Sequence, residues 1–420
     1  MILKRYISVL IIVLLNVSCY TSRDLSTKNM ASFYKPTDNI YHPEFSAWNQ
    51  RDSSIQLFVK VIPAEFLYVR QSDEGFKSFV KVVLEVVRSY DDTRVLDSTS
   101  SVFTFDILDK SVAKIVNLSL PTKQVGDLML RVVLYDLNKG AYEDYFVPLE
   151  IDNQATRNDF LFTNRRNEIL FDNYGNISDS LNIAFKDPAV KTMWCKYYKR
   201  NFSLPAPPFS FDIKSEFDYT PDSVFQVSVN DSFPIVFPEP GFYHLQPDTT
   251  KKGGATIYRF EPGFPNVSTP QHLLESMRYL TSKKEFEEMR KSVNLKAAVD
   301  NFWLARGGSE EKTRALIRKY YGRVQDANKY FTSYTEGWRT DRGMIYVIFG
   351  APSTLYLSAE SETWIYGTPN STLALNFFFT KVINPFTPND MTLSRAPIYE
   401  SNWYRAVETW RQGRAYNSYN

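Results

Sequence analysis

Cysteine and histidine are scarce in this chain, which has two cysteines and three histidines among 420 residues. Cys19 and Cys195 are too few for a disulfide framework, and no HxH, HExxH or CxxC pattern occurs. Three scattered histidines offer no spacing that is typical of a zinc site. We therefore expect neither a bound metal ion nor a cofactor.

The chain also lacks a long block of charge of one sign. Its 49 Lys and Arg residues nearly balance 47 Asp and Glu residues, for a formal net charge of +2. Nucleic-acid binders need a basic stripe to contact phosphates, so this balance argues against a nucleic-acid partner. Beyond the first residues, no apolar run reaches the length of a transmembrane helix, so we expect the rest to be soluble and tethered.

The first residues have the composition of an export signal. Lys4 and Arg5 precede an apolar run over residues 6–15 that is too short to span a bilayer as a helix. The Val-Ser-Cys sequence that ends at Cys19 resembles a bacterial lipobox, in which the cysteine is lipidated and becomes the mature N-terminus. We therefore expect a lipoprotein signal peptide over residues 1–19 and a palmitate-type anchor at Cys19. An ordinary signal peptide and an uncleaved anchor are the alternatives.

Residues 20–53 are polar and rich in residues that break secondary structure, which predicts a flexible tether. Asp24 is the only acidic residue directly after the cysteine, whereas signals for export to the cell surface resemble an acidic run. We therefore expect an anchor in the outer membrane that faces the periplasm rather than the cell surface.

Two β-rich regions follow the predicted tether. Residues 54–152 alternate apolar and polar side chains and contain breakers at regular spacing, which predicts an immunoglobulin-like sandwich without its disulfide. Residues 153–265 show a looser β pattern, interrupted by proline-rich links such as SLPAPPFS, and we expect a second β-rich domain there.

The hydrophobic period becomes helical at Thr269, which precedes Pro270 as an N-cap precedes a first-turn proline. Ser282 and Glu285 form a capping-box pattern, and Gly307-Gly308 ends a further helix. We expect an α+β domain over residues 266–420, with these helices layered on a small antiparallel sheet. GMIYVIFG, ETWIYG and TLALNFFFT are predicted to be its strands, and a C-terminal helix carrying Trp403, Val407 and Trp410 is predicted to dock on it.

One stretch of this last domain carries a motif. Gly337-Trp338-Arg339-Thr340-Asp341-Arg342-Gly343 precedes an apolar run, which Gly350-Ala351-Pro352 closes. With Glu362-Thr363-Trp364-Ile365-Tyr366 downstream, this stretch resembles the GWxTD domain of bacterial envelope proteins, whose members include predicted lipoproteins. The resemblance implies a fold and an envelope location, but it supplies no catalytic residues. The residues that carry it are Gly337, Trp338, Thr340, Asp341, Arg342, Gly343, Gly350 and Pro352.

The motif residues allow two interpretations. In the structural one, the glycines permit close backbone approach, Thr340 and Asp341 hold a turn, and Trp338 plugs the helices against the sheet. In the catalytic one, Asp341 and a nearby Glu336 or Glu362 act as the acid–base pair of a hydrolase, or of a glycan-binding enzyme, acting on cell-wall or surface polysaccharide.

Each interpretation of the motif leads to a hypothesis about function. Because every motif residue has a turn or packing role and no base–nucleophile pair is apparent, we expect a protein that is not an enzyme. It would bind or scaffold other envelope proteins, held to the membrane by its N-terminal lipid. The catalytic interpretation is kept as the alternative, with a glycan as its ligand.

Overall fold

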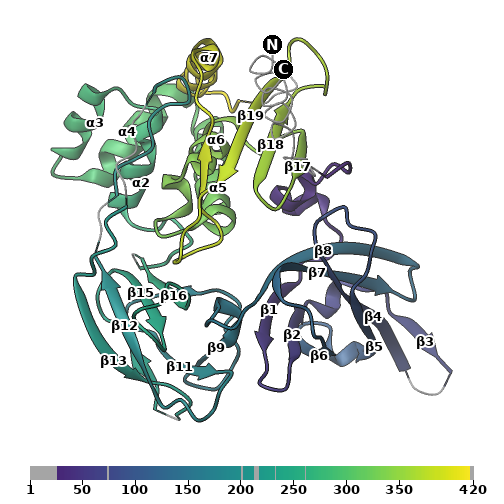
Figure 1. Cartoon of the computed structure of the whole chain (residues 1–420). Coiled ribbons are helices and arrows are strands. Elements are labelled where there is room, and N and C mark those ends of the chain that lie inside the picture. Colours follow the sequence, from purple (N-terminus) through teal and green to yellow (C-terminus); the bar gives the residue numbers. More distant parts are fainter. Residues whose placement is uncertain are drawn as a thin grey trace, which may run out of the picture.

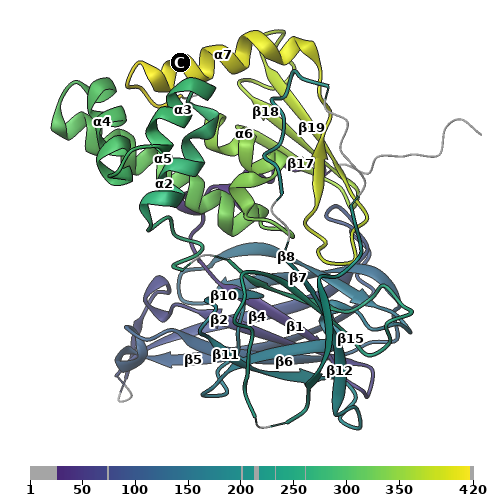
Figure 2. The ribbon, with the colours of Figure 1, turned by 90° about the vertical axis from the view of Figure 1, so that its left-hand side faces the viewer.

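The computed structural model describes residues 26–72, 75–199, 202–211, 217–231, 233–260 and 262–416. Cys19 and the predicted signal peptide lie outside these residues. Two β-rich bodies lie side by side at the bottom of Figure 1, and a third part with the helices and a further sheet lies above them. The quarter turn in Figure 2 shows the same two-tier arrangement, with the helical part over the β strands. The chain is therefore sheet-rich in its N-terminal part and helical toward its C-terminus, as expected.

The N-terminal body is a sandwich of antiparallel sheets. One sheet has the order β1 (Glu44–Asn49), β2 (Ser54–Val61) and β6 (Lys114–Pro121). The other has the order β3 (Val69–Gln71), β4 (Gly75–Val87), β7 (Gly126–Asp136) and β8 (Ala141–Ile151), with β5 (Asp97–Asp106) paired to β4. Successive side chains of a strand point to opposite faces of the sheet, and in β4 one face carries the core residues Val80, Val82, Leu84 and Val86, all of them buried.

The second β-rich body also consists of two sheets. The larger has the order β10 (Tyr174–Gly175), β16 (Ala255–Arg259), β15 (Gly241–Gln246), β12 (Thr192–Tyr198) and β13 (Ser223–Ser228). The smaller has the order β14 (Ile235–Val236), β11 (Ser180–Phe185) and β9 (Phe160–Asn164). Phe386, from the loop that follows β19, packs with aromatic residues of the larger sheet, and the Tyr258 hydroxyl donates to its carbonyl at 2.7 Å. This contact joins the body to the C-terminal part.

The three helix-terminus signals named above, at Thr269, Ser282 and Gly308, coincide with helix ends in the structure. α2 (Pro270–Ser276) starts after the N-cap Thr269, and α3 (Lys283–Arg290) starts with a complete capping box formed by Ser282 and Glu285. α4 (Leu295–Gly307) ends at Gly308, whose φ of 72° is the left-handed conformation that glycine adopts without strain. The longest helix is α5 (Glu310–Phe331), and it buries one face against α4 and the motif.

The C-terminal sheet has the antiparallel order β17 (Thr354–Leu357), β18 (Ser361–Tyr366), β19 (Leu375–Lys381) and β20 (Met391–Leu393). The strands predicted at ETWIYG and TLALNFFFT are confirmed. The C-terminal helix α7 (Glu400–Arg411) docks on the same part of the chain, with Trp403 and Trp410 buried. One sheet covered by helices therefore forms the upper tier.

The predicted strand at GMIYVIFG is wrong, because this segment is α6 (Asp341–Phe349). Every residue of α6 is buried, so its apolar run has no polar face whose period could distinguish a helix from a strand. The local signal lay instead in Thr340, an N-cap residue followed by an acidic residue in the first turn. A helix also satisfies its own backbone hydrogen bonds, which a strand buried away from the sheet would not.

The predicted tether over residues 20–53 is also wrong for the residues that the structure describes. The Ser26 N–H donates to the Leu357 carbonyl at 2.7 Å, and the Met30 N–H donates to the Leu355 carbonyl at 2.8 Å. This segment therefore follows the edge strand β17, and β1 begins at Glu44. Polar composition was misleading because these residues pair with a sheet edge that the chain forms more than 300 residues later.

A proline-rich segment links the lower and upper tiers. Residues 202–211, which we call the strap, leave the second β-rich body and cross the C-terminal part of the chain. Its backbone carbonyls accept hydrogen bonds from Arg339, from Arg395 and from the N–H of Ala396. The ring of Phe209 lies 5.3 Å from the ring of Tyr404 on α7.

Candidate functional site

The motif forms the corner between α5 and α6, and its two central glycines allow the backbones there to touch. A Cβ at Gly337 would lie 1.9 Å from the carbonyl oxygen of Ala327 on α5. A Cβ at Gly343 would lie 1.9 Å from the carbonyl oxygen of Gly337. Neither distance leaves room for any side chain, so both positions require glycine.

Thr340 begins α6 and joins it to the short helical turn Gly337–Arg339 before it. Its Oγ1 accepts a hydrogen bond from the Gly343 N–H at 3.0 Å and donates one to the Gly337 carbonyl at 2.8 Å. This hydroxyl satisfies a donor that the first turn of a helix would otherwise leave unpaired. Its role in the structure is therefore that of a cap.

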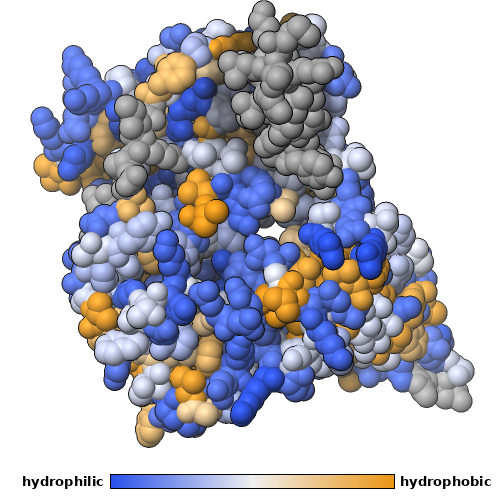
Figure 3. Space-filling view, in the orientation of Figure 1, coloured by the Kyte–Doolittle hydropathy of each residue, from blue (hydrophilic) through white to orange (hydrophobic). Residues whose placement is uncertain are grey.

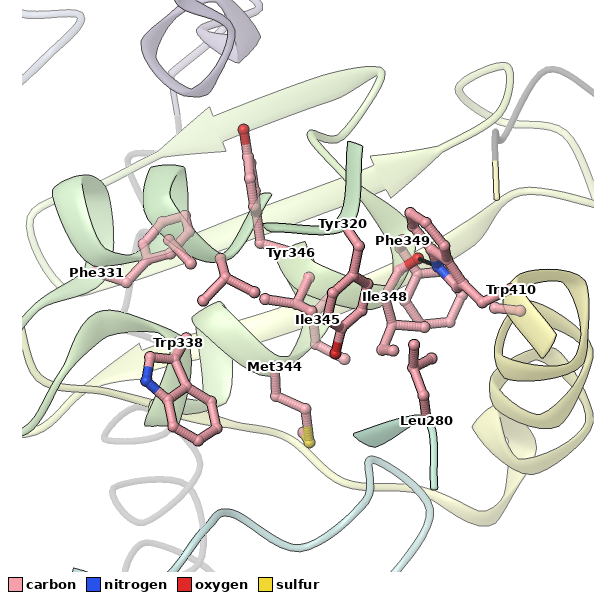
Figure 4. Close-up of a cluster of buried hydrophobic side chains, with 14 of the residues drawn as sticks. Leu280, Tyr320, Phe331, Trp338, Met344, Ile345, Tyr346, Ile348, Phe349 and Trp410 are labelled. Carbon is pink, nitrogen blue, oxygen red and sulfur yellow. Dashed lines mark hydrogen bonds between the residues drawn. The ribbon is translucent and has the colours of Figure 1, made fainter. Parts of the chain in front are cut away.

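Trp338 packs between the helices rather than projecting into solvent. Its side chain is buried, its backbone N–H donates to Asn328 Oδ1 at 3.2 Å, and its carbonyl accepts from the Tyr279 hydroxyl at 3.0 Å. Figure 4 shows Trp338 and Met344 on one side of α6, with Tyr346 pointing to the other. Trp338 therefore holds the corner against α5 and against the short helical turn Met277–Tyr279 that follows α2.

Asp341 is bound by partners from distant parts of the chain. Its Oδ1 lies 2.6 Å from Arg395 Nη2, and its Oδ2 accepts from Arg395 Nη1 at 3.2 Å and from the Leu393 N–H at 2.8 Å. Arg395 Nη2 also donates to the Ala206 carbonyl of the strap at 3.1 Å. The carboxylate therefore orients an arginine that connects α6, the strand β20 and the strap.

Arg342 is the centre of a second buried network. Its guanidinium pairs with Glu362 of β18 and donates to the Asn389 carbonyl at 2.8 Å. Glu362 also accepts from the Tyr34 hydroxyl at 3.1 Å and from Trp364 Nε1 at 2.8 Å. Burial, together with the negative charge of Glu362, raises the pKa of Tyr34 well above its ordinary value, so this phenol stays protonated and donates.

The far end of α6 is closed by Arg323, which the sequence did not single out, and by the motif residues Gly350 and Pro352. The Arg323 guanidinium donates to the Ile348 carbonyl at 2.9 Å and to the Tyr416 carbonyl at 2.7 Å. Burial lowers its pKa to about 10, so it remains cationic at the C-terminal, negative end of the helix. Gly350 ends the helix with a φ of 85°, and Pro352 is buried where the chain turns into β17.

These contacts argue against Asp341 as a general base. Asp341 and Glu362 are both buried and each is paired with a different arginine. Glu336, the other proposed partner, accepts from the Thr335 hydroxyl at 2.9 Å and lies 3.7 Å from Arg339. An acid–base pair needs carboxyl groups that face a substrate and exchange protons with it, which these ion pairs oppose.

Cys195 and His244 both lie inside the second β-rich body. Burial raises the pKa of the Cys195 thiol, which is the opposite of what a nucleophilic cysteine needs. Burial lowers the pKa of His244 to about 3, and its Nδ1 lies 2.8 Å from Thr256 Oγ1 and its Nε2 lies 3.2 Å from the Lys252 carbonyl. His244 is therefore neutral, and neither residue is arranged as a nucleophile or base.

A hollow next to the motif lies between the strap and the helices. It has a volume of about 760 Å³, with Met344 of α6 and Trp403 and Val407 of α7 in its wall. A second hollow of about 310 Å³ contains Trp338 and Arg339, and Arg278 and Leu204 line both. We call the two hollows together the strap groove. Motif residues thus contribute to its wall, whereas their charged groups are bonded to the protein itself.

The described part of the chain offers neither a cluster of metal ligands nor a membrane-spanning helix. No group of three or more His, Cys, Asp or Glu side chains there is placed to hold a metal ion. Within the same residues, no helix has both the length and the apolar composition needed to cross a bilayer.

Comparison with known families identifies the C-terminal part. Residues 241–412 match the GWxTD domain, so the chain carries this domain in its C-terminal part. The match begins at β15 and runs through the helices and the C-terminal sheet to α7. No curated protein matches the chain.

Sequence reasoning found the motif but not its partners. Arg395 and Asn389 lie in segments without a recognisable local pattern, Arg323 lies on a helix whose pattern does not indicate its partner, and Tyr34 lies in the predicted tether. A buried acidic residue at a helix start does imply a cationic partner, which was the one available signal. The identity of that partner depends on tertiary contacts between residues 54 positions apart.

Proposed function

We propose that this chain is a lipid-anchored protein of the cell envelope whose modules bind or scaffold other envelope proteins, without a catalytic step of its own. One observation carries the proposal. The side chains of the polar motif residues Thr340, Asp341 and Arg342 all make internal contacts: Thr340 caps α6, and Asp341 and Arg342 each form a buried ion pair. A motif used in this way supports a rigid scaffold rather than a reaction centre.

We infer further that the anchor is a lipid on Cys19 and that the protein sits in the outer membrane, facing the periplasm. The sequence around Cys19 supports the lipid. A cysteine-to-alanine change at this position is expected to abolish metabolic incorporation of an alkyne-labelled palmitate. Labelling that survives the change would contradict the anchor while leaving the binding role open.

The N-terminal sandwich supports the binding role. Its strand order, with β1-β2-β6 on one sheet and β4-β7-β8 plus β5 on the other, supports an immunoglobulin-like module. Large apolar side chains on and after β5 are exposed, including Val102 at 54%, Leu108 at 89% and Val112 at 58%. We call residues 102–112 the β5 patch. Figure 3 shows hydrophobic side chains over the sandwich at the lower right of this face.

An apolar patch of this kind on a soluble domain is typical of a protein-binding surface. The test is affinity capture of the tagged full chain after mild solubilisation of the membrane. We expect a stoichiometric envelope protein to be captured with it, and we expect Val102→Glu with Leu108→Glu to release that protein. Leu373→Glu is the matched control, because Leu373 is 92% exposed but lies in the C-terminal part. Recovery of the wild-type chain alone would contradict the proposal.

A further inference from the structure

The strap groove has the features of a ligand site that is separate from the β5 patch. Its larger hollow of about 760 Å³ falls within the range of small-molecule pockets, roughly 300–1,000 Å³. Leu204, Pro205 and Phe209 of the strap face Met344, Trp403 and Val407 across it. The walls are therefore mainly apolar, as in sites that bind small ligands.

The groove offers few backbone groups for a peptide. Pro205, Pro207 and Pro208 have no N–H, so over residues 205–208 the strap has a single backbone donor, at Ala206. The carbonyls of Phe202, Ala206 and Pro208 already accept hydrogen bonds from Arg339, Arg395 and Ala396. The opposite wall is helical, and its backbone is satisfied internally. An extended peptide would lose hydration without gaining partners, whereas an acyl chain has no polar groups to satisfy.

The charge of the groove favours an anion. Its lining contains four arginines and two glutamates, for a formal charge of +2: Arg278, Arg290, Arg339, Arg411, Glu275 and Glu408. Three of these arginines already face a carboxylate: Arg411 lies 2.9 Å from Glu285, Arg290 lies 3.8 Å from Glu287, and Arg339 lies 3.7 Å from Glu336. Arg278 instead donates to the Thr281 carbonyl at 3.1 Å and lies over the Phe286 ring. It has no carboxylate within ion-pair distance among the described residues, and it lines both hollows.

We propose that the strap groove binds a single-chain amphiphile with an anionic head group. The apolar chain lies between the strap and the α6–α7 wall, and the carboxylate or phosphate pairs with Arg278. A guanidinium binds either head group through paired N–H donors, so the two share one recognition chemistry. Arg278 and Leu204 line both hollows, so a head group held by Arg278 lies beside the apolar wall that would take the chain.

The test is photo-crosslinking of the full chain in membranes with a fatty acid that carries a diazirine in its chain. The alcohol of the same chain is the matched probe without the charge. Peptides are then mapped by mass spectrometry, and we expect the acid to label the strap and α7. Excess unlabelled fatty acid and excess lysophosphatidate, added separately as competitors, distinguish a carboxylate head from a phosphate head.

Two variants and a control separate the head-group contact from the chain contact. Arg278→Gln is expected to lower labelling by the acid about tenfold, as loss of a charged hydrogen bond does, and to leave labelling by the alcohol unchanged. Val407→Trp fills the hollow from a half-buried position of α7 and is expected to remove labelling by both probes. Arg318→Gln, on an exposed face of α5 away from the groove, is expected to change neither.

Thermal unfolding of each variant checks that it is folded. Labelling of the strap and α7 that Val407→Trp removes from a folded protein supports the site even if Arg278→Gln does not fold. Labelling confined to other peptides would overturn the proposal. The proposal would also be overturned if folded Arg278→Gln protein were labelled by the acid and by the alcohol to the same extent as the wild type.

Discussion

Replacing Asp341 with Asn removes the negative charge that pairs with Arg395 while keeping the size of the side chain. In the native protein the Asp341 side chain is fully buried and that of Arg395 is 9% exposed. The substitution leaves the guanidinium buried without a counter-charge, although it still donates to the strap carbonyl of Ala206. We expect a large loss of stability and a looser strap.

The burial of the pair sets the size of the effect. Removing one partner of a buried ion pair costs about 3–5 kcal/mol, because the remaining charge is stranded away from water. At about 2–4 °C per kcal/mol for a unit of this size, Tm should fall by roughly 10 °C. The exposed pair between Lys296 and Asp300, with side chains 54% and 39% exposed, is the matched control. Asp300→Asn should cost no more than about 1 kcal/mol.

The assay is thermal unfolding of the full chain, combined with hydrogen exchange of the strap. Asp341→Asn should lower Tm and speed exchange near Ala206, whereas Asp300→Asn should do neither. The double variant Asp341→Asn with Arg395→Met should be less destabilised than the sum of the single changes, since it leaves no stranded charge. Equal Tm values for the Asp341 and Asp300 variants, or strictly additive losses, would refute the reasoning.

Three further predictions concern packing and buried titratable groups. Gly343→Ala should destabilise the protein by more than about 2 kcal/mol in denaturant unfolding, because its Cβ would lie 1.9 Å from a carbonyl oxygen, whereas Gly322→Ala in open space should be neutral or stabilising. His244 has a folded pKa of about 3 and an ordinary value near 6.5, so its contribution is complete above pH 6.5 and is lost toward pH 3. His244→Gln should therefore flatten stability between pH 6 and 4, and an unchanged slope would contradict its burial as a neutral ring. Cys195 should resist alkylation until the protein unfolds, and rapid native-state labelling would contradict its burial.

The motif is better understood by its place in the fold than by its chemistry. Gly337 and Gly343 let α5, the corner and α6 touch, and Thr340 starts the helix. The next two residues are charged and link α6 to other elements. Asp341 bonds Arg395, which reaches the strap, and Arg342 bonds Glu362 of β18. A buried helix with satisfied ends provides the rigid core on which the groove and the sheet are built.

Local chemistry allowed several features to be predicted. The N-caps Thr269 and Ser282 and the helix end at Gly308 act within one helical turn, so their meaning does not depend on distant contacts. The alternation in β4 likewise reports a strand with one buried face. The family resemblance rested on such short-range signals, and the match over residues 241–412 confirms it.

The two wrong predictions concern segments whose structure depends on contacts with distant parts of the chain. A fully buried helix such as α6 has the same apolar run as a buried strand, and only packing between α5 and the sheet decides between them. The segment from Ser26 to Tyr34 reads as polar coil because its partners, the β17 edge and Glu362, come from the other end of the sequence. The sequence by itself determined the caps, most strands and the family. Tertiary structure alone decided which charges meet, because pairing energy depends on distance and burial rather than on position along the chain.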